Sequence, residues 1–400
     1  MAELTISEVY KAAEVLQNVA RHPKLIGVTK LNPEAQVYLK PENLQYTGSF
    51  KLRGAYYKIS QLSPEEKERG VVACSAGNHA QGVALGATHN GIKSIICLPA
   101  GAPLSKIEAT KALGAEVCLV PGVYDDAYRK ALELQQEKGY TLVHPFDDPL
   151  VIAGQGTIGL EIIQDMPDVD AVIVPVGGGG LISGVAFAIK TIKPNVKVYG
   201  VQAEGAPSMV QSLAEGSRVT LSEVSTIADG IAVKEPGINT YELCRKYVDE
   251  IVTVSDDEVA AAILTLIEQQ KLVAEGAGAV SVAAAMFNKV PIKGKKVVCI
   301  VSGGNIDVTS LNRVITRGLV KNGRDCTISL TMSDKPGQLS KVCSVVGNLG
   351  ANILSVEHKR NSTNTQISGC KLHMEVETLN HEHILLIKQG LRDAGFTVDD

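Results

Sequence analysis

The chain is poor in several features that mark particular classes of protein. Its 400 residues include no tryptophan and only five phenylalanines, so its core must consist mainly of Val, Ile, Leu and Ala. No apolar run approaches the roughly 20 residues that a membrane-spanning helix requires. The start of the chain, Met1–Leu4, lacks the basic and then apolar pattern of a secretory signal. We therefore expect a cytoplasmic protein with no membrane partner.

Paired cysteines and an excess of one charge are also absent. None of the eight cysteines belongs to a Cys-x-x-Cys motif, and most lie within apolar runs, where a free cysteine behaves as a small hydrophobe. No disulfide framework is expected in such a chain. The 39 Lys and Arg residues nearly balance the 43 Asp and Glu residues, for a net charge of −4. This balance argues against a nucleic-acid partner.

What is present is a long alternation of apolar runs and helical patterns. An amphipathic helix is expected over residues 5–20, with Ser7 as its cap. Strands made of continuous apolar runs between helices predict a parallel sheet covered on both faces. The expected strands are 36–40, 71–74, 94–98, 117–120, 141–144, 171–176, 197–202 and 297–301. Helices are expected over 80–90, 106–113, 124–138, 156–165, 181–193, 256–270 and 276–287.

The pattern changes after residues 318–324, which are predicted to form a linker. The order that follows is βαββαβ, the ferredoxin-like arrangement, with strands at 326–332, 352–358, 366–377 and 396–398 and helices at 338–349 and 381–394. The chain is thus predicted to be an α/β protein of two parts. Residues 1–320 form a two-lobed unit with open parallel sheets, whose small lobe, about 52–153, is inserted in the large lobe. Residues 325–400 form the ferredoxin-like domain.

Three short stretches together indicate one cofactor. Thr47–Lys51 places a lysine in a loop of small residues, while Gly177–Gly180 and Ser302–Asn305 each directly follow an apolar run. A strand that ends in glycines leaves backbone N–H groups free for a phosphate. A lysine nearby can form a Schiff base with a phosphorylated aldehyde, and Phe50 would help to desolvate its amine. We therefore predict pyridoxal 5'-phosphate bound to Lys51.

Two other segments carry polar groups that suit this chemistry, although each also has a structural interpretation. Ser75–Gln81 follows a strand and opens a helix, so its N–H groups suit a substrate carboxylate and Asn78 suits the phenolic oxygen of the cofactor. The alternative is a turn capped by Ser75, and His79 is more readily structural than catalytic. Ser302 lies at the carboxyl end of a strand, where its hydroxyl suits the pyridine nitrogen or a helix cap.

Two alternatives remain open at this point. Gly177–Gly180 loosely matches a dinucleotide-binding turn, with Glu204 near the position of the ribose-binding acid, which would make the chain a hydride-transfer enzyme. Asp147 and Asp148 are weak candidates for a metal, but no other residue has ligand spacing, so no metal is predicted.

Ser49–Ala55, Ser75–Gln81, Gly177–Gly180, Ala228–Val233 and Ser302–Asn305 resemble the motifs of the threonine dehydratases (threonine ammonia-lyases), pyridoxal-phosphate enzymes of the tryptophan-synthase-β-like class. The resemblance covers about residues 5–320. It implies that Lys51 is the Schiff-base lysine, that Asn78 contacts the phenolic oxygen and that Ser302 contacts the ring nitrogen. The implied phosphate-binding residues are Gly177, Gly178, Gly179, Gly180 and Leu181. The loop that receives the substrate carboxylate comprises Ser75, Ala76, Gly77 and His79.

The resemblance implies a β-elimination that converts L-threonine to 2-oxobutyrate and ammonia, with L-serine as a poorer substrate that yields pyruvate. One departure from related enzymes bears on the reaction. In the similar serine racemases a second serine acts on the opposite face of the α-carbon, and here that position is Ala76. Because alanine cannot move a proton, elimination is favoured over racemisation.

The C-terminal residues resemble an ACT domain, a regulatory module that binds small ligands. Asp334–Leu339 is similar to its first loop, and Asn348–Ile353 to its helix-to-strand turn. The resemblance implies a homo-oligomer, a dimer or tetramer, with an amino-acid effector between paired domains. Isoleucine is the effector expected first, because it is the end product of the biosynthetic pathway, and valine is expected as an opposing ligand. The alternative that the chain is mainly an amino-acid sensor leaves Lys51 unexplained.

Overall fold

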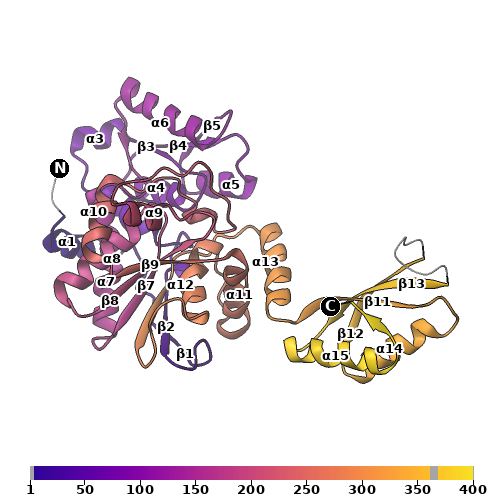
Figure 1. Ribbon diagram of the computed structural model, residues 1–400. Helices are drawn as coiled ribbons and strands as arrows, with labels where there is room; N and C mark the ends of the chain where they lie inside the picture. Colours follow the sequence, from indigo (N-terminus) through magenta and orange to yellow (C-terminus); the bar gives the residue numbers. More distant parts are fainter. Residues whose placement is uncertain (1–3, 361–367, 400) are drawn as a thin grey trace. The chain divides into compact units, whose positions relative to one another are not determined.

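The computed structural model describes residues 4–360 and 368–399. They form two compact units, of which the first ends at Val308 and the second begins at Thr309 (Figure 1). Among the described residues, no helix is long and apolar enough to cross a membrane.

The smaller sheet of the first unit has four parallel strands in the order β5-β4-β3-β6. Alternate residues of each strand point to opposite faces, so Val71 and Ala73 pack with helix α4, whereas Val72 and Cys74 pack with helix α6. These elements, drawn in violet in Figure 1, form the small lobe of the first unit. Their bounds are β3 Val71–Cys74, α4 Asn78–His89, β4 Ser94–Pro99, α5 Leu104–Ala112, β5 Glu116–Val120, α6 Tyr124–Lys138 and β6 Thr141–Leu142.

The larger sheet has six strands in the order β1-β2-β10-β7-β8-β9, and only β1 is antiparallel to its neighbour. Helices α7, α8 and α10 pack on one face through a shared apolar core, and α12 covers the other face. The strands are β1 Ile26–Val28, β2 Gln36–Pro41, β7 Ala171–Pro175, β8 Lys197–Ala203, β9 Glu250–Val254 and β10 Lys296–Val301. The remaining helices are α1 Ile6–Leu16, α2 Lys51–Ser60, α3 Pro64–Arg69, α7 Pro149–Asp165, α8 Gly180–Ile192, α9 Ser208–Glu215, α10 Ile238–Tyr247, α11 Asp256–Thr265 and α12 Gly276–Met286.

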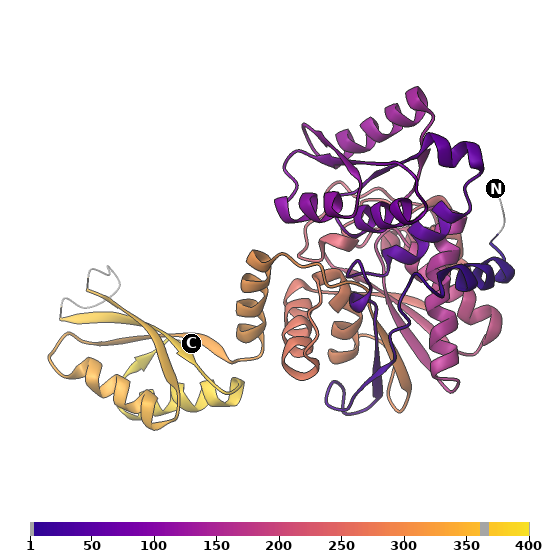
Figure 2. The same ribbon diagram turned by 180° about the vertical axis from the view of Figure 1, so that it is seen from behind.

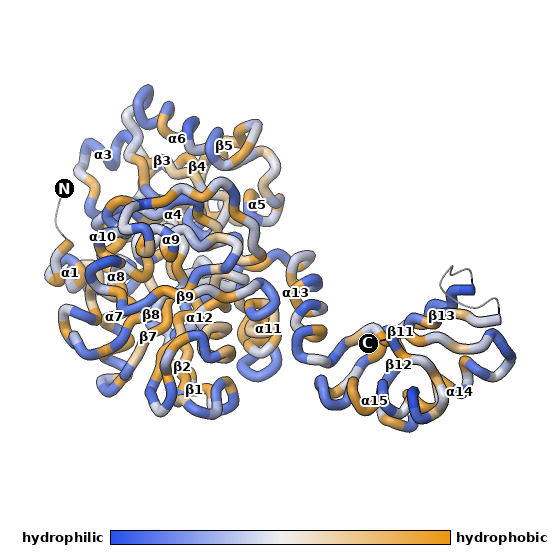
Figure 3. The backbone as a smooth tube through the Cα atoms, viewed as in Figure 1, coloured by the Kyte–Doolittle hydropathy of each residue, from blue (hydrophilic) through white to orange (hydrophobic). Residues whose placement is uncertain are grey.

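Burial follows the hydropathy of the chain. In Figure 3, β7 is mainly hydrophobic because it lies inside the first unit, whereas α6 is mostly hydrophilic because only one of its faces is buried. The structure thus confirms the predicted parallel sheet that is covered on both faces.

Glycines allow helix α2 to pack closely between α4 and α7. A Cβ added to Gly154 of α7 would lie 2.6 Å from Cα of Gly54, and one added to Gly82 of α4 would lie 3.0 Å from the Lys51 carbonyl oxygen. Side chains at these positions would push the helices apart. The close packing fixes the start of α2, and therefore Lys51.

The second unit has the predicted βαββαβ order after an initial helix. Its antiparallel sheet has the strand order β12-β13-β11-β14. Every second residue of β13 is buried, from Cys370 to Val376, in a core shared with α14 and α15, and Figure 2 shows both helices on one face of the sheet. The bounds are α13 Val308–Lys321, β11 Asp325–Ser333, α14 Gln338–Asn348, β12 Asn352–Lys359, β13 Gly369–Glu377, α15 His381–Asp393 and β14 Thr397–Val398. Residues 366 and 367 of the predicted strand lie outside the described residues.

Three local predictions are wrong. Thr5 caps α1 in place of Ser7 and accepts a hydrogen bond from the Glu8 N–H. Helix α7 begins at Pro149, seven residues before the expected start, because Asp148 caps it. The expected linker at 318–324 is helical up to Lys321, because α13 buries Val314 and Gly318 on one face. By contrast, the predicted helix over 256–270 is present with its capping box, although its last five residues, Leu266–Gln270, form a π-helix.

Candidate active site

The loop that carries Lys51 is hydrogen bonded to the loop that carries Ser302. Ser49 and Gly303 form an isolated antiparallel bridge. The Phe50 N–H donates to the Ser302 carbonyl at 3.1 Å, and the Gly304 N–H donates to the Gly48 carbonyl at 2.9 Å. The two loops meet because they follow β2 and β10, which are neighbouring parallel strands. The fold thus unites two of the three predicted cofactor-binding stretches.

Lys51 is half-buried at the first residue of α2. Its Nζ donates to the Pro145 carbonyl at 2.8 Å and lies 5.3 Å from the centroid of the Phe50 ring. Burial lowers the pKa of the Lys51 amine to about 8, although the negative charge of Glu275 opposes this change. A much larger fraction of the amine is therefore neutral near pH 8 than for an exposed lysine.

The third stretch, Gly177–Gly180, lies against the same 145–146 loop. A Cβ added to Gly178 would lie 2.5 Å from the Phe146 ring, and one added to Gly180 would lie 2.8 Å from Cβ of Phe146. Gly179 has a φ of +97°, which side-chain-bearing residues rarely adopt. Helix α8 begins at Gly180, so its first N–H groups have no partners within the helix. The glycines form a cradle of bare backbone at a positive helix end.

Asn78 connects the Ser302 loop to a carboxyl group that the sequence analysis missed. Its Nδ2 donates to Oε1 of Glu275 at 2.6 Å, and its Oδ1 accepts from Asn305 at 2.8 Å. Glu275 is only 5% exposed. Burial raises the pKa of its carboxyl to about 7, with a further increase from Asp229 and opposing effects from Asn78, Lys106 and Lys51. In the sequence, the only sign of this group is that Glu275 directly precedes the small-residue segment Gly276–Gly278, a pattern that resembles an ordinary helix start.

The segment from Ser75 to Gly77 forms a half-buried turn at the start of α4. The Ser75 hydroxyl accepts from the Gly77 N–H at 3.1 Å, and Gly77 occupies the cap position without a side-chain cap. The alternative in which Ser75 caps the helix is therefore wrong. A Cβ added to Gly77 would meet nothing within 4 Å, so this position borders open space. Ala76 packs partly against the core of the small lobe.

His79 is a buried, neutral side chain. Its Nε2 donates to the Val143 carbonyl at 2.8 Å, and its Nδ1 is buried without a hydrogen-bond partner. Burial, with a smaller contribution from the charge of Lys51, lowers the pKa of His79 to about 3. This geometry supports the structural interpretation of His79.

The remaining predicted residues are also buried near these loops. The Ser302 hydroxyl donates to the Ala277 carbonyl at 3.3 Å. It caps no helix, because α13 begins only at Val308. Leu181 is buried in the first turn of α8. The structure therefore rejects the helix-cap alternative for Ser302.

The two acidic candidates for a metal act as helix caps. Asp147 accepts from the N–H groups of Ile238 and Thr240 at the start of α10, at 2.9 and 3.2 Å. Asp148 accepts from the N–H of Leu150 at 2.8 Å. Their carboxylates thus have structural partners. Glu204, the candidate for a ribose-binding acid, is exposed just after β8.

A buried network of four charges, also missed by the sequence analysis, anchors helix α2. Arg53 is 1% exposed and donates to both carboxylate oxygens of Glu42 at 2.8 Å. It also donates to Glu161 at 2.6 and 2.9 Å, and Lys40 pairs with Glu161 at 2.5 Å. The network ties α2, two residues after Lys51, to β2 and α7.

These features fit pyridoxal phosphate. The glycine turn exposes backbone N–H groups that suit a phosphate, and Lys51, whose pKa is lowered, donates a hydrogen bond to the neighbouring 145–146 loop. The orphaned Nδ1 of His79 and the buried Ser49 hydroxyl, which also lacks a partner, lie within these cofactor-binding segments. The geometry therefore favours a phosphorylated aldehyde over a dinucleotide.

Comparison with known proteins gives the same result. Residues 20–303 match the family model described as pyridoxal-phosphate dependent enzyme. The chain is 52% identical to an L-threonine ammonia-lyase of Thermotoga maritima over 397 residues, 99% of each chain. It is 49% identical to the catabolic L-threonine dehydratase of Escherichia coli K12 over 283 residues, 70% of this chain and 86% of the relative.

Solved structures agree. The processed form of threonine deaminase isoform 2 from Solanum lycopersicum matches with a TM-score of 0.73 at 42% identity, over 78% of this chain and 93% of that one. Maize serine racemase matches with a TM-score of 0.75 at 33% identity, over 80% and 99%. The nicotinamide alternative is therefore wrong. The chain belongs to the family of pyridoxal-phosphate-dependent enzymes, and its cofactor is pyridoxal 5'-phosphate.

Proposed function

We propose that the chain is a threonine ammonia-lyase that converts L-threonine to 2-oxobutyrate and ammonia, with L-serine as a poorer substrate that gives pyruvate. The observation that carries the proposal is the half-buried Lys51 with its lowered pKa, in a chain whose Ser75–Gly77 turn has at its second residue, Ala76, no proton-transferring group. The overall conversion balances, because the water lost from the β-carbon is regained when the C–N bond is hydrolysed.

We assign the predicted residues the following roles. The N–H groups of Gly177–Gly180 and Leu181 would bind the cofactor phosphate, and Lys51 would hold its aldehyde carbon. Asn78 would orient the phenolic oxygen, and Phe50 would exclude water from one side of Lys51. The Ser302 hydroxyl would lie at the pyridine nitrogen.

The cofactor, when bound, supplies an electron sink for the bond that breaks at the α-carbon. The Lys51 amine would accept the α-proton, and its lowered pKa increases the fraction of the amine that is neutral and able to do so. Ser75, Ala76 and Gly77 would receive the substrate carboxylate at the positive end of α4, and His79 supports this turn. Because Ser302 offers a hydroxyl and no carboxylate, it would not hold the ring nitrogen protonated.

Glu275 adds a second buried group that binds and releases a proton near neutral pH. Its pKa of about 7 keeps part of the carboxyl protonated, so it can hold a proton beside Asn78. Its charge also acts on Lys51. We assign Glu275 to controlling the protonation of this site.

Racemisation is the competing function, since the chain resembles maize serine racemase. Removing a proton on one face and returning it on the other needs two acid–base groups, and Ala76 offers none. The threonine methyl adds only about 1–3 kcal/mol of discrimination over serine. We therefore propose elimination with a modest preference for threonine.

The second unit is proposed to be an ACT-type regulatory domain. Its βαββαβ order and antiparallel sheet support this assignment, and the match to the Thermotoga maritima enzyme includes it, because 397 residues are matched. We propose that the chain forms a homo-oligomer and that isoleucine binds this domain as an inhibitor.

The reaction is tested with the purified holoenzyme and L-threonine. We expect 2-oxobutyrate and ammonia in equal amounts, a shift of the visible cofactor band, and no D-amino acid by chiral chromatography. Formation of D-serine from L-serine faster than pyruvate would establish racemisation as the main activity and contradict the proposal.

A further inference from the structure

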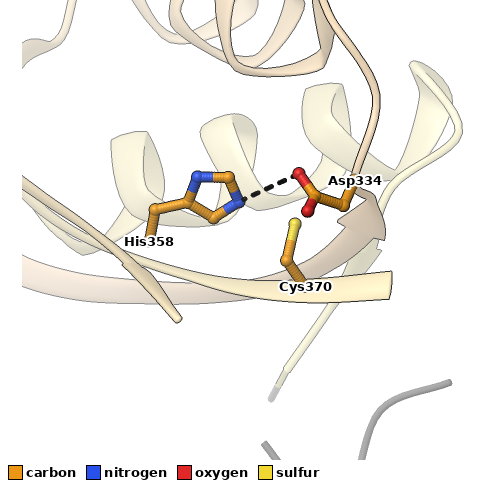
Figure 4. A group of neighbouring side chains, drawn as sticks. All are labelled: Asp334, His358 and Cys370. Atoms are coloured by element: carbon orange, nitrogen blue, oxygen red, sulfur yellow. Dashed lines mark ion pairs between the residues drawn. The ribbon is translucent and has the colours of Figure 1, made fainter. Parts of the chain in front are cut away.

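Three side chains that commonly bind metals meet in the second unit, outside the candidate active site. They are Asp334, His358 and Cys370, and their ligand atoms all lie within 4.8 Å of one another (Figure 4). Among the residues that the structure describes, this is the only such group of three. Nothing in the proposed elimination uses it.

The sheet topology explains why residues so far apart in the sequence meet. Strand β13 lies between β11 and β12. Cys370 pairs with Met332 at the end of β11, two residues before Asp334, and His358 on β12 pairs with Leu372 of β13. The three ligand atoms therefore converge at one end of three adjacent strands, where strand pairing fixes their backbones.

The hydrogen bonding leaves this cluster incomplete. Nε2 of His358 is buried and has no hydrogen-bond partner. It lies 3.9 Å from Oδ1 of Asp334, too far for a hydrogen bond. The other Asp334 oxygen is paired with Arg360 at 3.0 Å, which leaves Oδ1 directed at the histidine. The Cys370 thiol has only a weak contact with the Met332 carbonyl, at 3.6 Å.

We propose that Asp334, His358 and Cys370 bind one zinc ion. An imidazole nitrogen, a thiolate and a carboxylate form a mixed donor set that suits zinc, whereas calcium and magnesium prefer oxygen alone. Ligand atoms on a tetrahedral zinc lie about 3.3–3.6 Å apart, so the cluster must contract by about 1 Å. Binding displaces the thiol proton of Cys370 to solvent and gives Nε2 of His358 its missing partner.

Three protein ligands leave the fourth position of the ion open. In zinc proteins such a position holds water or a small ligand. The proposed ion would link the ends of β11, β12 and β13 and offer one exchangeable site in the second unit. This inference is independent of the reaction assigned to the first unit.

The test uses cobalt(II) as a spectroscopic substitute for zinc in the full-length, metal-free holoenzyme. We expect one equivalent of cobalt to produce ligand-field bands in the red, where pyridoxal phosphate does not absorb, and a thiolate charge-transfer band in the difference spectrum. Added zinc should abolish both. Absence of these bands, with no zinc retained after dialysis, would overturn the proposal.

Matched variants locate the ion. Cys370→Ser should lose the thiolate band. Loss of a group that only hydrogen bonds to a metal ligand weakens metal affinity about 10- to 100-fold. Because His358 is itself a proposed ligand, His358→Gln should weaken cobalt binding by more than about 100-fold. The control is Cys343→Ser, which alters a half-buried cysteine of α14 outside the cluster. This variant should bind cobalt as the unmodified chain does. Unchanged binding in His358→Gln would place the ion elsewhere, and this result stands even where Cys370→Ser fails to fold.

Discussion

At the scale of single residues, Lys51 is the group on which turnover depends. Lys51→Ala removes the amine that accepts the α-proton, so we expect the rate of 2-oxobutyrate formation to fall by at least about a thousandfold. Some pyridoxal phosphate should remain bound through the glycine cradle. Lys93→Ala removes an exposed lysine paired with Glu116 and should leave the rate unchanged. Appreciable steady-state turnover by Lys51→Ala would contradict the assignment.

The pH dependence of kcat should report the Lys51 amine in the substrate complex. Only the neutral amine accepts a proton, so kcat should rise with pH through the pKa of about 8. The negative charge of Glu275 raises this pKa. In Glu275→Gln that charge is gone, so the rising limb should move to lower pH.

The measurement is kcat at saturating L-threonine across the pH range, for Glu275→Gln and for a control. Glu242→Gln alters an exposed carboxylate paired with Arg245 and should leave the limb in place. A limb that stays fixed in Glu275→Gln, or moves to higher pH, would show that Glu275 does not act on the Lys51 charge.

At the scale of secondary-structure elements, Arg53 should decide how firmly α2 is held. Arg53→Ala leaves the carboxylates of Glu42 and Glu161 buried with less compensation, which is expected to cost about 3–5 kcal/mol. Arg218→Ala breaks a half-exposed pair with Glu235 and should cost less than about 1 kcal/mol. Denaturant midpoints of the two variants test the difference. Equal midpoints would mean that the buried network contributes little.

The glycine turn before α8 should tolerate no side chain. In Gly178→Ala the new Cβ would lie 2.5 Å from the Phe146 ring, and overpacking of about 1–3 kcal/mol should distort the cradle. We expect weaker pyridoxal-phosphate binding, measured by cofactor titration of the apoenzyme. Gly101→Ala, where a Cβ meets nothing within 4 Å, is the control. Unchanged affinity for pyridoxal phosphate in Gly178→Ala would show that the phosphate does not bind at this turn.

At the scale of the whole molecule, the proposed regulation should reside in the second unit. A chain that ends after Lys321 keeps α13 intact, whereas a cut at residue 318 would fall within that helix. We expect this truncated chain to retain 2-oxobutyrate formation and to lose inhibition by isoleucine. Steady-state rates with and without isoleucine, for both chains, make the comparison. Inhibition that persists after truncation would place the effector site in the first unit.

The parallel sheets and the positions of the three cofactor-binding stretches could be predicted from the order of residues alone. Continuous apolar runs must be covered on both faces, and a turn such as Gly177–Gly180 must leave backbone N–H groups bare, whatever the surrounding fold. The βαββαβ order of the second unit could also be predicted, because β11 and β13 alternate buried residues with less buried ones. Helix ends were less predictable, since Thr5 and Ser7 are both capping residue types and the weaker one, Thr5, is the cap.

Which distant polar groups share a buried site depends on the folding of the whole chain and could not be predicted from local sequence. Asn78 and Glu275 are 197 residues apart in the chain, and Arg53 and Glu161 are 108 apart. A single acid before a helix or a single arginine in one has no local signature, because its pKa and its partners depend on burial and on which strands are neighbours. Asp334, His358 and Cys370 meet for the same reason, through the pairing of β13 with the strands on either side.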